Sequence, residues 1–262
     1  MDVSNLIEDT IKKSIADYFE GKKKISVNHV LDMIFPEERR IRSLIGGLET
    51  SLGTRLWEPL ALAFAAKNGF NILNHKELNK RVPIIPDEVR HFISDYENSK
   101  KGGADILGWE FYKSLCDFIK ERKIVVDKYQ KIPKGEGVDI WIEKSGVEYL
   151  IDIKTNQINA GLGSKLTTNQ ANWYTYRALE YTENKVICLL AFPFNPHNDK
   201  DFWIKEGGKV KPLISGKEAV VADEFWDFLL GKENTTQLIF DSFKRIGEQG
   251  FGKQFEHIFK MN

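Results

Sequence analysis

The sequence has few cysteines and no long apolar run. Only two of its 262 residues are cysteine, Cys116 and Cys188, which is too few for a disulfide framework. Cys188 stands in an apolar, strand-like run, where we expect it to fill the core of a protein in a reducing compartment. No stretch approaches the roughly 20 apolar residues of a membrane-spanning helix, and the N-terminus has no signal-peptide pattern. These absences predict a cytoplasmic protein without a membrane partner.

The sequence also lacks an excess of one charge. Lys plus Arg and Asp plus Glu are equal at 38 each, so the formal net charge is zero. This balance argues against a simple polycation that coats nucleic acid. It does not exclude a nuclease, because an acidic metal site and a basic groove cancel in the total. No histidine or cysteine pair has zinc-ligand spacing, and no Gly-rich phosphate loop is present, so an ATP-driven reaction is not expected.

What the sequence does contain is ample material for a packed core, with 42% hydrophobic residues and no internal repeat. Residues 70–105, rich in Pro, Asn, Lys and Asp, are expected to form loops with short elements. The apolar periodicity predicts strands near 123–128, 137–143, 147–154 and 185–193, and helices near 5–20, 27–35, 41–69, 109–121, 169–181, 222–230 and 235–247. Pro36 is expected to end the second helix, and Gly53 to interrupt the third, with Thr54 as a new N-cap. Asn234 or Thr235 is expected to cap the last helix.

The order of these elements indicates the fold class. Ser145-Gly146 is expected to form the turn of a hairpin between the second and third strands. The helix near 169–181 has a length that suits a crossover to a parallel fourth strand. We therefore predict an α/β fold with a mixed central sheet flanked by helices, and extra helices at both ends of the chain. We expect a single domain over 1–262, with a helical part over 1–50 that is a candidate for dimerisation, and a catalytic core over 51–262.

Two aspartates stand inside apolar, β-branched runs of the predicted hairpin. Asp139 occurs in Gly-Val-Asp-Ile-Trp-Ile, and Asp152 in Tyr-Leu-Ile-Asp-Ile-Lys, with twelve residues between the two aspartates. Lys154 lies two residues after Asp152, so on a strand it shares the same face. Carboxylates are costly to remove from water unless a cation or a proton compensates. A divalent metal held by the two aspartates beside a lysine explains the pattern.

This arrangement is typical of phosphodiester hydrolysis. Mg²⁺ prefers oxygen ligands and often takes only one or two carboxylates, so Asp139 and Asp152 fit as ligands, with the backbone carbonyl of Ile153 between them. Lys154 would orient or help to deprotonate the attacking water, or stabilise charge on the phosphate. A lysine near a metal can have its pKa lowered enough for such a role.

The motif Asp139, twelve residues, Asp152-Ile153-Lys154 resembles the core of the PD-(D/E)XK nuclease superfamily. Val138 stands where the strict pattern has proline. The chain is most similar to type II restriction endonucleases of that superfamily, which implies Mg²⁺, double-stranded DNA, a homodimer and a cognate DNA methyltransferase as genetic partner. The tract 223–237 also resembles enzymes that cut GGNCC-type sites.

Members of the superfamily often contribute a glutamate from an N-terminal helix beside the sheet. Glu58, in Ser-Leu-Gly-Thr-Arg-Leu-Trp-Glu, is similar to that residue and is our fourth catalytic candidate. The structural alternative is a glutamate favoured at a helix start by the helix dipole. Gln170 and Tyr174 resemble a Q-x-x-x-Y element of some relatives, and at a spacing of four they share a helix face. An ordinary amphipathic helix explains the same spacing.

The segment after Lys154 is dense in amides, hydroxyls and glycine. Asn and Gln side chains can read adenine edges, and Ser or Thr can hold phosphate. The alternative is an ordinary polar surface loop. Arg55, Lys100, Lys101, Lys131 and Lys134 are candidates for phosphate contacts, although for each one taken alone a solvated surface charge is the favoured alternative. The DNA-binding candidates are Arg55, Asn156, Gln157, Asn159, Ser164, Lys165, Thr167, Asn169, Gln170 and Tyr174.

The leading hypothesis is a Mg²⁺-dependent, site-specific DNA endonuclease acting as a homodimer, because palindromic targets are matched by two-fold symmetric proteins. A repair or phage-type exonuclease with the same core is the alternative among enzymes. A non-catalytic DNA-binding protein with a nuclease-like sheet is the alternative from another class, and the intact set of Asp139, Asp152 and Lys154 argues against it.

Overall fold

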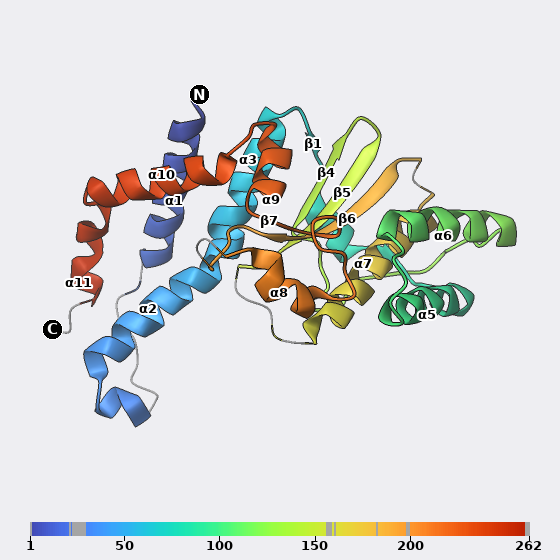
Figure 1. Ribbon diagram of the computed structural model, residues 1–262, viewed down its shortest axis with the longest axis horizontal. Helices are drawn as coiled ribbons and strands as arrows, with labels where there is room; N and C mark the ends of the chain where they lie inside the picture. Colours follow the sequence, from blue (N-terminus) through green and yellow to red (C-terminus); the bar gives the residue numbers. More distant parts are fainter. Residues whose placement is uncertain are drawn as a thin grey trace. The chain divides into compact units, whose positions relative to one another are not determined.

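The computed structural model describes residues 2–20, 22, 30–155, 159, 161–181, 183–197 and 200–259. These residues form two compact units, one made of residues 1–61 and 232–262 and the other of residues 62–231 (Figure 1). In the described part of the chain, no helix is both long enough and apolar enough to span a membrane. The predicted division into a helical part over 1–50 and a core over 51–262 stays a prediction.

The first unit is helical. Its α1 pairs with α10, and the ion pair from Arg245 Nε to Glu8 Oε1, 2.8 Å long, joins the two helices. Tyr18, Phe19 and Leu44 pack with Phe255 near the end of the chain to form its aromatic-rich core. The elements are α1 (Val3–Phe19), the 3₁₀ turn η1 (Val30–Met33), α2 (Pro36–Leu52), the π-helical turn η2 (Gly53–Trp57), the first residues of α3 (Glu58–Lys67), α10 (Thr235–Glu248), the 3₁₀ turn η3 (Phe251–Phe255) and α11 (Glu256–Phe259).

Four predictions for this unit are wrong in detail. Pro36 does not end a helix but occupies the first turn of α2, where its missing N–H costs nothing. Of the helix predicted over 27–35, residues 27–29 lie outside the described residues, and the 3₁₀ turn η1 covers part of the rest. Thr54 caps no new helix, because the backbone continues from α2 through a π-helical turn into α3. Asn234 precedes α10 without a side-chain cap bond.

The second unit contains a mixed sheet, as predicted. Its five strands run in the order β1 (Asn71–Ile72), β4 (Ile140–Lys144), β5 (Val147–Ile153), β6 (Lys185–Phe192) and β7 (Ala219–Val221). Of these, β1 and β7 were not predicted. The hairpin β4–β5 turns at Ser145-Gly146, and both of these residues have positive φ, as a tight hairpin turn requires. β5 and β6 are parallel and are joined by α7 (Leu162–Leu179), which is the predicted crossover. A small second sheet pairs β2 (Val82–Pro83) with β3 (Tyr129–Gln130).

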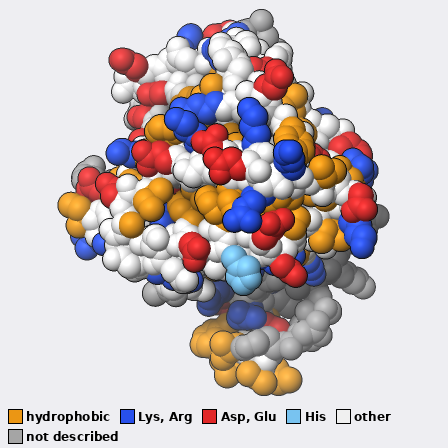
Figure 2. All heavy atoms as spheres, turned by 90° about the vertical axis from the view of Figure 1, so that its right-hand side faces the viewer, with side chains coloured by type: hydrophobic (Ala, Val, Ile, Leu, Met, Phe, Trp, Pro, Cys, Tyr) orange, Lys and Arg blue, Asp and Glu red, His pale blue; other side chains and the backbone are white. Residues whose placement is uncertain are grey.

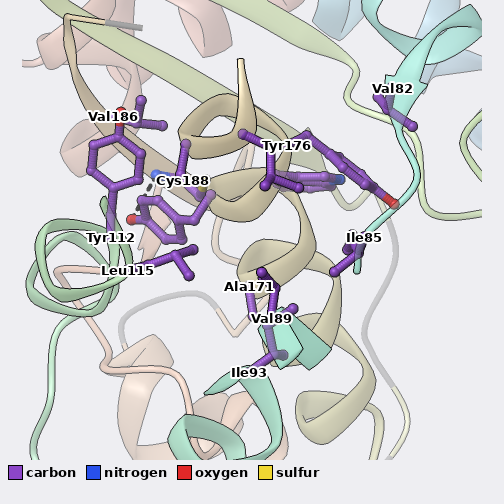
Figure 3. Packing of buried hydrophobic residues seen from close by; sticks show 14 of the residues in the cluster. Val82, Ile85, Val89, Ile93, Tyr112, Leu115, Ala171, Tyr176, Val186 and Cys188 are labelled. Carbon is purple, nitrogen blue, oxygen red and sulfur yellow. Dashed lines mark hydrogen bonds between the residues drawn. The ribbon is translucent and has the colours of Figure 1, made fainter. Parts of the chain in front are cut away.

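Helices cover both faces of this sheet (Figure 1). On one face α7 packs on β6, with α5 (Asp87–Lys101) and α6 (Gly108–Arg122) packed against it. Figure 3 shows Tyr112 of α6 beside Val186 of β6, and Val89 and Ile93 of α5 beside Ala171 of α7. On the other face Tyr149 of β5 contacts Phe70 and Phe228. The remaining bounds are α4 (His75–Lys80), α8 (Phe202–Val210) and α9 (Asp223–Leu230).

Three predictions for the second unit are corrected. Residues 70–105 contain the 15-residue helix α5, whose inward face carries Val89, Ile93 and Tyr96. No strand forms over 123–128, where Val125 is 80% exposed and the β-branched run has no partner strand. The helix α7 begins at Leu162, not near residue 169. The sequence did not indicate its first two turns because hydroxyl and amide side chains there are weak helix formers.

Candidate active site

Asp152 lies near the end of β5 and faces α7. Side chains two residues apart share a face of a strand, so Asp152 points to the same side as Glu148 and Leu150. Glu148 accepts a hydrogen bond of 2.8 Å from Arg177 Nε of α7, and Leu150 belongs to the same hydrophobic cluster as Ala171. Asp152 is only 6% exposed. A carboxylate at this depth needs a charged partner.

Lys154 is that partner among the described residues. Its Nζ lies 2.7 Å from Oδ1 and 2.5 Å from Oδ2 of Asp152. Its backbone N–H donates to the carbonyl oxygen of Ala191 in β6 over 2.9 Å, which fixes the base of the side chain. The lysine side chain is 30% exposed and that of Asp152 is 9% exposed, so the ammonium group lies between the buried carboxylate and solvent.

Asp139 lies directly before β4, where the hairpin ladder ends. Its backbone N–H donates to the carbonyl oxygen of Ile151 over 3.0 Å. Its carboxylate Oδ2 accepts a hydrogen bond of 2.8 Å from the N–H of Ile153. Asp139 is therefore held against residues 151–153, the segment that carries Asp152. The two acidic residues, with twelve residues between them in the sequence, thus lie at one end of the hairpin.

The carbonyl group of Ile153 is directed to the same place. In a β-strand the N–H and C=O groups of one residue point to the same neighbouring strand. The N–H of Ile153 donates to Asp139, whereas the next N–H, that of Lys154, points the other way to β6. The Ile153 carbonyl oxygen is thus directed towards the Asp139 side of β5.

The donor set suits a hard cation. Two carboxylates and one carbonyl group lie at the same end of the hairpin. Mg²⁺ commonly takes one or two carboxylates and completes its sphere with water and phosphate. Within the described ranges, no three His, Cys, Asp or Glu side chains gather in a way that would hold a metal ion by themselves. The residues present fit a metal that keeps part of its coordination sphere for water and substrate.

Glu58 and Arg55 belong to the first unit. Glu58 is the first residue of α3 and directly follows the π-helical turn Gly53–Trp57. Such turns within helices are frequent at functional sites. Arg55 lies within that turn, is exposed, and lines a hollow of about 400 Å³ together with Lys13 and Asp17. The catalytic role of Glu58 and the DNA contact of Arg55 stay predictions.

The predicted DNA-reading loop is shorter than expected. Asn156 and Gln157 lie outside the described residues, and Asn159 is exposed. Ser164 and Lys165 stand in the first turn of α7, where Lys165 is exposed and Ser164 is half-buried. These positions remain compatible with contacts to DNA.

Burial contradicts the predicted DNA contacts of the α7 residues further along. Thr167 is 1% exposed, and its hydroxyl donates to the carbonyl oxygen of Gly163. Gln170 donates to the carbonyl oxygen of Glu218, and the hydroxyl of Tyr174 accepts from the backbone N–H of Cys188. Asn169 is 4% exposed. The cause is the position of α7, which lies between the sheet and other helices and so has little free face.

The predicted phosphate contact of Lys100 is also wrong. Its side chain is 0% exposed and forms an ion pair with the buried carboxylate of Glu218. Lys101, Lys131 and Lys134 are exposed. Sequence reasoning missed a hollow of about 940 Å³, which is lined in part by Lys101, Ser164, Trp203, Lys211 and Ser215. No single motif marks it, because its walls come from three helices and two loops.

Comparison with known proteins identifies the family. A family model described as "Type II restriction endonuclease, HinfI" matches residues 1–247. The chain is also 27% identical over 225 residues to the type II restriction enzyme MjaII of Methanocaldococcus jannaschii, a match that covers 81% of this chain and 56% of the relative. The chain thus spans about half the length of this curated relative. No solved structure matches. On the family match, which covers nearly its whole length, the chain belongs to the HinfI family of type II restriction endonucleases.

Proposed function

We propose that this chain is a Mg²⁺-dependent type II restriction endonuclease that hydrolyses phosphodiester bonds at a short, palindromic or nearly palindromic site in double-stranded DNA. The observation that carries the proposal is the ion pair of Lys154 with Asp152. Asp139 lies beside this pair, because its carboxylate accepts a hydrogen bond from the N–H of Ile153. The family match supports the reaction class. A cognate DNA methyltransferase is the expected genetic partner.

Each residue of the site has a separate task in this proposal. Asp139, Asp152 and the Ile153 carbonyl would hold the metal, which when bound acidifies a coordinated water and neutralises charge on the phosphate. Lys154, at the solvent side of Asp152, would orient the attacking water or stabilise the phosphate oxygens. Glu58 would add a carboxylate from the start of α3.

DNA contacts are proposed for Arg55, Asn159, Ser164 and Lys165, to which the hollow adds Lys101 and Lys211. Cations and hydroxyls of this kind hold phosphates and set the register of a protein on the duplex. Figure 2 shows acidic and basic side chains interspersed on the face that it presents, with no broad basic patch on that face. A GGNCC-type target is proposed from the resemblance of the tract 223–237 to enzymes that cut such sites. Two residues of that tract, Phe225 and Trp226, are buried in the core.

We propose that the active form is a homodimer, because one copy has one such site and both strands must be cut. A surface for the second copy is offered by the segment of η1 and the start of α2, whose apolar side chains are unusually exposed. We call it the η1–α2 surface; its members are Val30, Leu31, Met33, Ile34, Phe35, Ile41 and Ile45. Met33→Glu should convert the dimer to a monomer, as measured by analytical ultracentrifugation. The control is Val125→Glu, which should stay dimeric, because Val125 is about as exposed as Met33 but lies in the other unit.

The deciding experiment is digestion of a closed circular plasmid and of linear DNA with purified protein and Mg²⁺. Discrete fragments with a common sequence at their ends are expected, and sequencing those ends gives the target and the cut position. Loss of linear DNA alone would favour the exonuclease alternative. DNA binding with no cleavage under any divalent metal would favour the non-catalytic one.

A further inference from the structure

One buried polar atom of α7 has no protein partner among the described residues. The side-chain oxygen Oδ1 of Asn169, a residue that is only 4% exposed, accepts no hydrogen bond from the part of the chain that the structure describes. Leaving such an acceptor without a partner is unfavourable, and in native proteins it commonly marks a functional group or an absent ligand. Asn169 therefore calls for a partner other than the surrounding protein.

The height of Asn169 along the sheet follows from its neighbours in α7. Leu166 belongs to the same hydrophobic cluster as Leu190 of β6. Gln170 donates to the carbonyl oxygen of Glu218 over 3.2 Å, and the N–H of Leu190 donates to that same oxygen. Leu190 is the register partner of Asp152 in the parallel pair β5–β6. The helical turn that contains Asn169 thus lies over the row of Asp152.

The direction of Asn169 follows from the helix period. Residues four apart share a helix face, so Asn169 points to the same side as Trp173. The indole Nε1 of Trp173 donates to the carbonyl oxygen of Glu136 over 2.7 Å, in the segment that leads to Asp139. Asn169 lies one turn nearer the N-terminus of α7. Its side chain is therefore directed to the region between Asp139 and Asp152.

We infer that Asn169 is a further oxygen ligand of the metal site, which rests on the proposed nuclease function. An amide carbonyl oxygen is a hard ligand of the kind that Mg²⁺ and Mn²⁺ accept. It adds no negative charge to a site that already has two carboxylates. Binding of the cation would give Oδ1 the partner that the protein does not supply.

The test is Mn²⁺ binding measured by calorimetry on the purified chain without DNA. Asn169→Ala should weaken binding about 10- to 100-fold, the range known for polar groups that support a metal site. Asn169→Asp should restore or tighten it. Asn172→Ala, at a half-buried asparagine of the same helix, is the matched control and should bind normally.

A second measurement separates a ligand from a structural residue. Asn169→Leu keeps the approximate shape of the side chain and removes the orphaned oxygen, so its denaturation midpoint without metal should equal or exceed that of the parent protein. If Asn169→Ala kept the Mn²⁺ affinity of the parent protein while Asp152→Asn lost Mn²⁺ binding, the proposed role of Asn169 would be overturned and the metal site would stand. Unchanged affinity in Asp152→Asn would overturn the proposed metal site itself.

Discussion

The ammonium group of Lys154 contacts both carboxylate oxygens of Asp152, at 2.7 and 2.5 Å, although the two residues are separated by a single position on β5. The strand period places them on one face, and the burial of the carboxylate makes the pairing necessary. The lysine thereby stands at the solvent side of the acidic pair, where a phosphate would approach.

Lys154→Ala should abolish cleavage and leave most DNA binding in place. The ammonium group is the only cation recorded on Asp152 among the described residues, and its loss removes the group that orients water or stabilises phosphate. We expect a fall in the cleavage rate of about 10²- to 10⁴-fold, the usual contribution of such a group. Plasmid cleavage and gel-shift assays check this, with Lys113→Ala on the exposed face of α6 as control. A normal cleavage rate in Lys154→Ala would show that the catalytic site lies elsewhere.

Asp139→Asn and Asp139→Ala should separate metal binding from folding. The amide oxygen of asparagine can still accept the hydrogen bond from Ile153, which is 2.8 Å long, whereas alanine cannot. Both variants should need more Mg²⁺ for cleavage, because both remove a negative ligand. Only Asp139→Ala should also lose stability, by about 1–2 kcal/mol in urea unfolding. Equal Mg²⁺ dependence in parent and Asp139→Asn would exclude the ligand role.

The proximity of Asp139, Asp152 and Lys154 was predictable from the sequence because it is local. Asp139, Asp152 and Lys154 stand on two strands joined by a tight turn, so the hairpin alone brings them together. The spacing of two residues fixed the shared face of Asp152 and Lys154 without knowledge of the rest of the fold. The mixed sheet was predictable for the same reason, since a turn and a crossover helix determine strand direction.

The DNA-binding side was predictable only in part, because composition does not report burial. Thr167 and Gln170 resemble loop residues in type, yet they lie in a helix with packed neighbours on several sides. Lys100 resembles a phosphate contact, but its partner Glu218 is 118 positions away, and no sequence pattern joins them. The sequence signal for α5 was likewise weak, since its polar outer face outweighs three inward apolar residues.

Glu206→Gln should reduce stability at neutral pH and flatten its pH dependence. Burial alone would raise the pKa of Glu206, but hydrogen bonds from Lys209 and His197 outweigh it and leave the pKa below its ordinary value of 4.5. The Oε2–Nζ distance to Lys209 is 2.7 Å and the Oε1–Nε2 distance to His197 is 2.9 Å. Because the folded-state pKa is lowered, the stabilisation is present above the unfolded value and is lost as the pH falls through the folded one.

Urea unfolding across the acid range checks this prediction. The parent protein should lose stability relative to Glu206→Gln as the pH falls below 4.5, and the difference should be constant at higher pH. Glu121→Gln on the exposed face of α6 is the control and should follow the parent protein. A parent curve parallel to that of Glu206→Gln through the acid range would contradict the assignment.

Lys100→Met should destabilise the second unit strongly. The substitution leaves the carboxylate of Glu218 charged, buried and without its counter-ion. Breaking a buried pair from one side typically costs about 3–5 kcal/mol. The N–H groups of Gly108 and Ile214, each 2.8 Å from a carboxylate oxygen, remain as partners and should keep the loss near the lower end of that range.

The double variant Lys100→Met/Glu218→Gln tests the cause of that loss. Removing the uncompensated charge should recover part of the stability, because a neutral amide can still accept hydrogen bonds at that position. Lys101→Met, at the exposed neighbour, should change the free energy of unfolding by no more than about 0.5 kcal/mol. If Lys100→Met were as stable as Lys101→Met, the ion pair would not hold α5 to the segment before β7, and Lys100 would again be available as a phosphate contact.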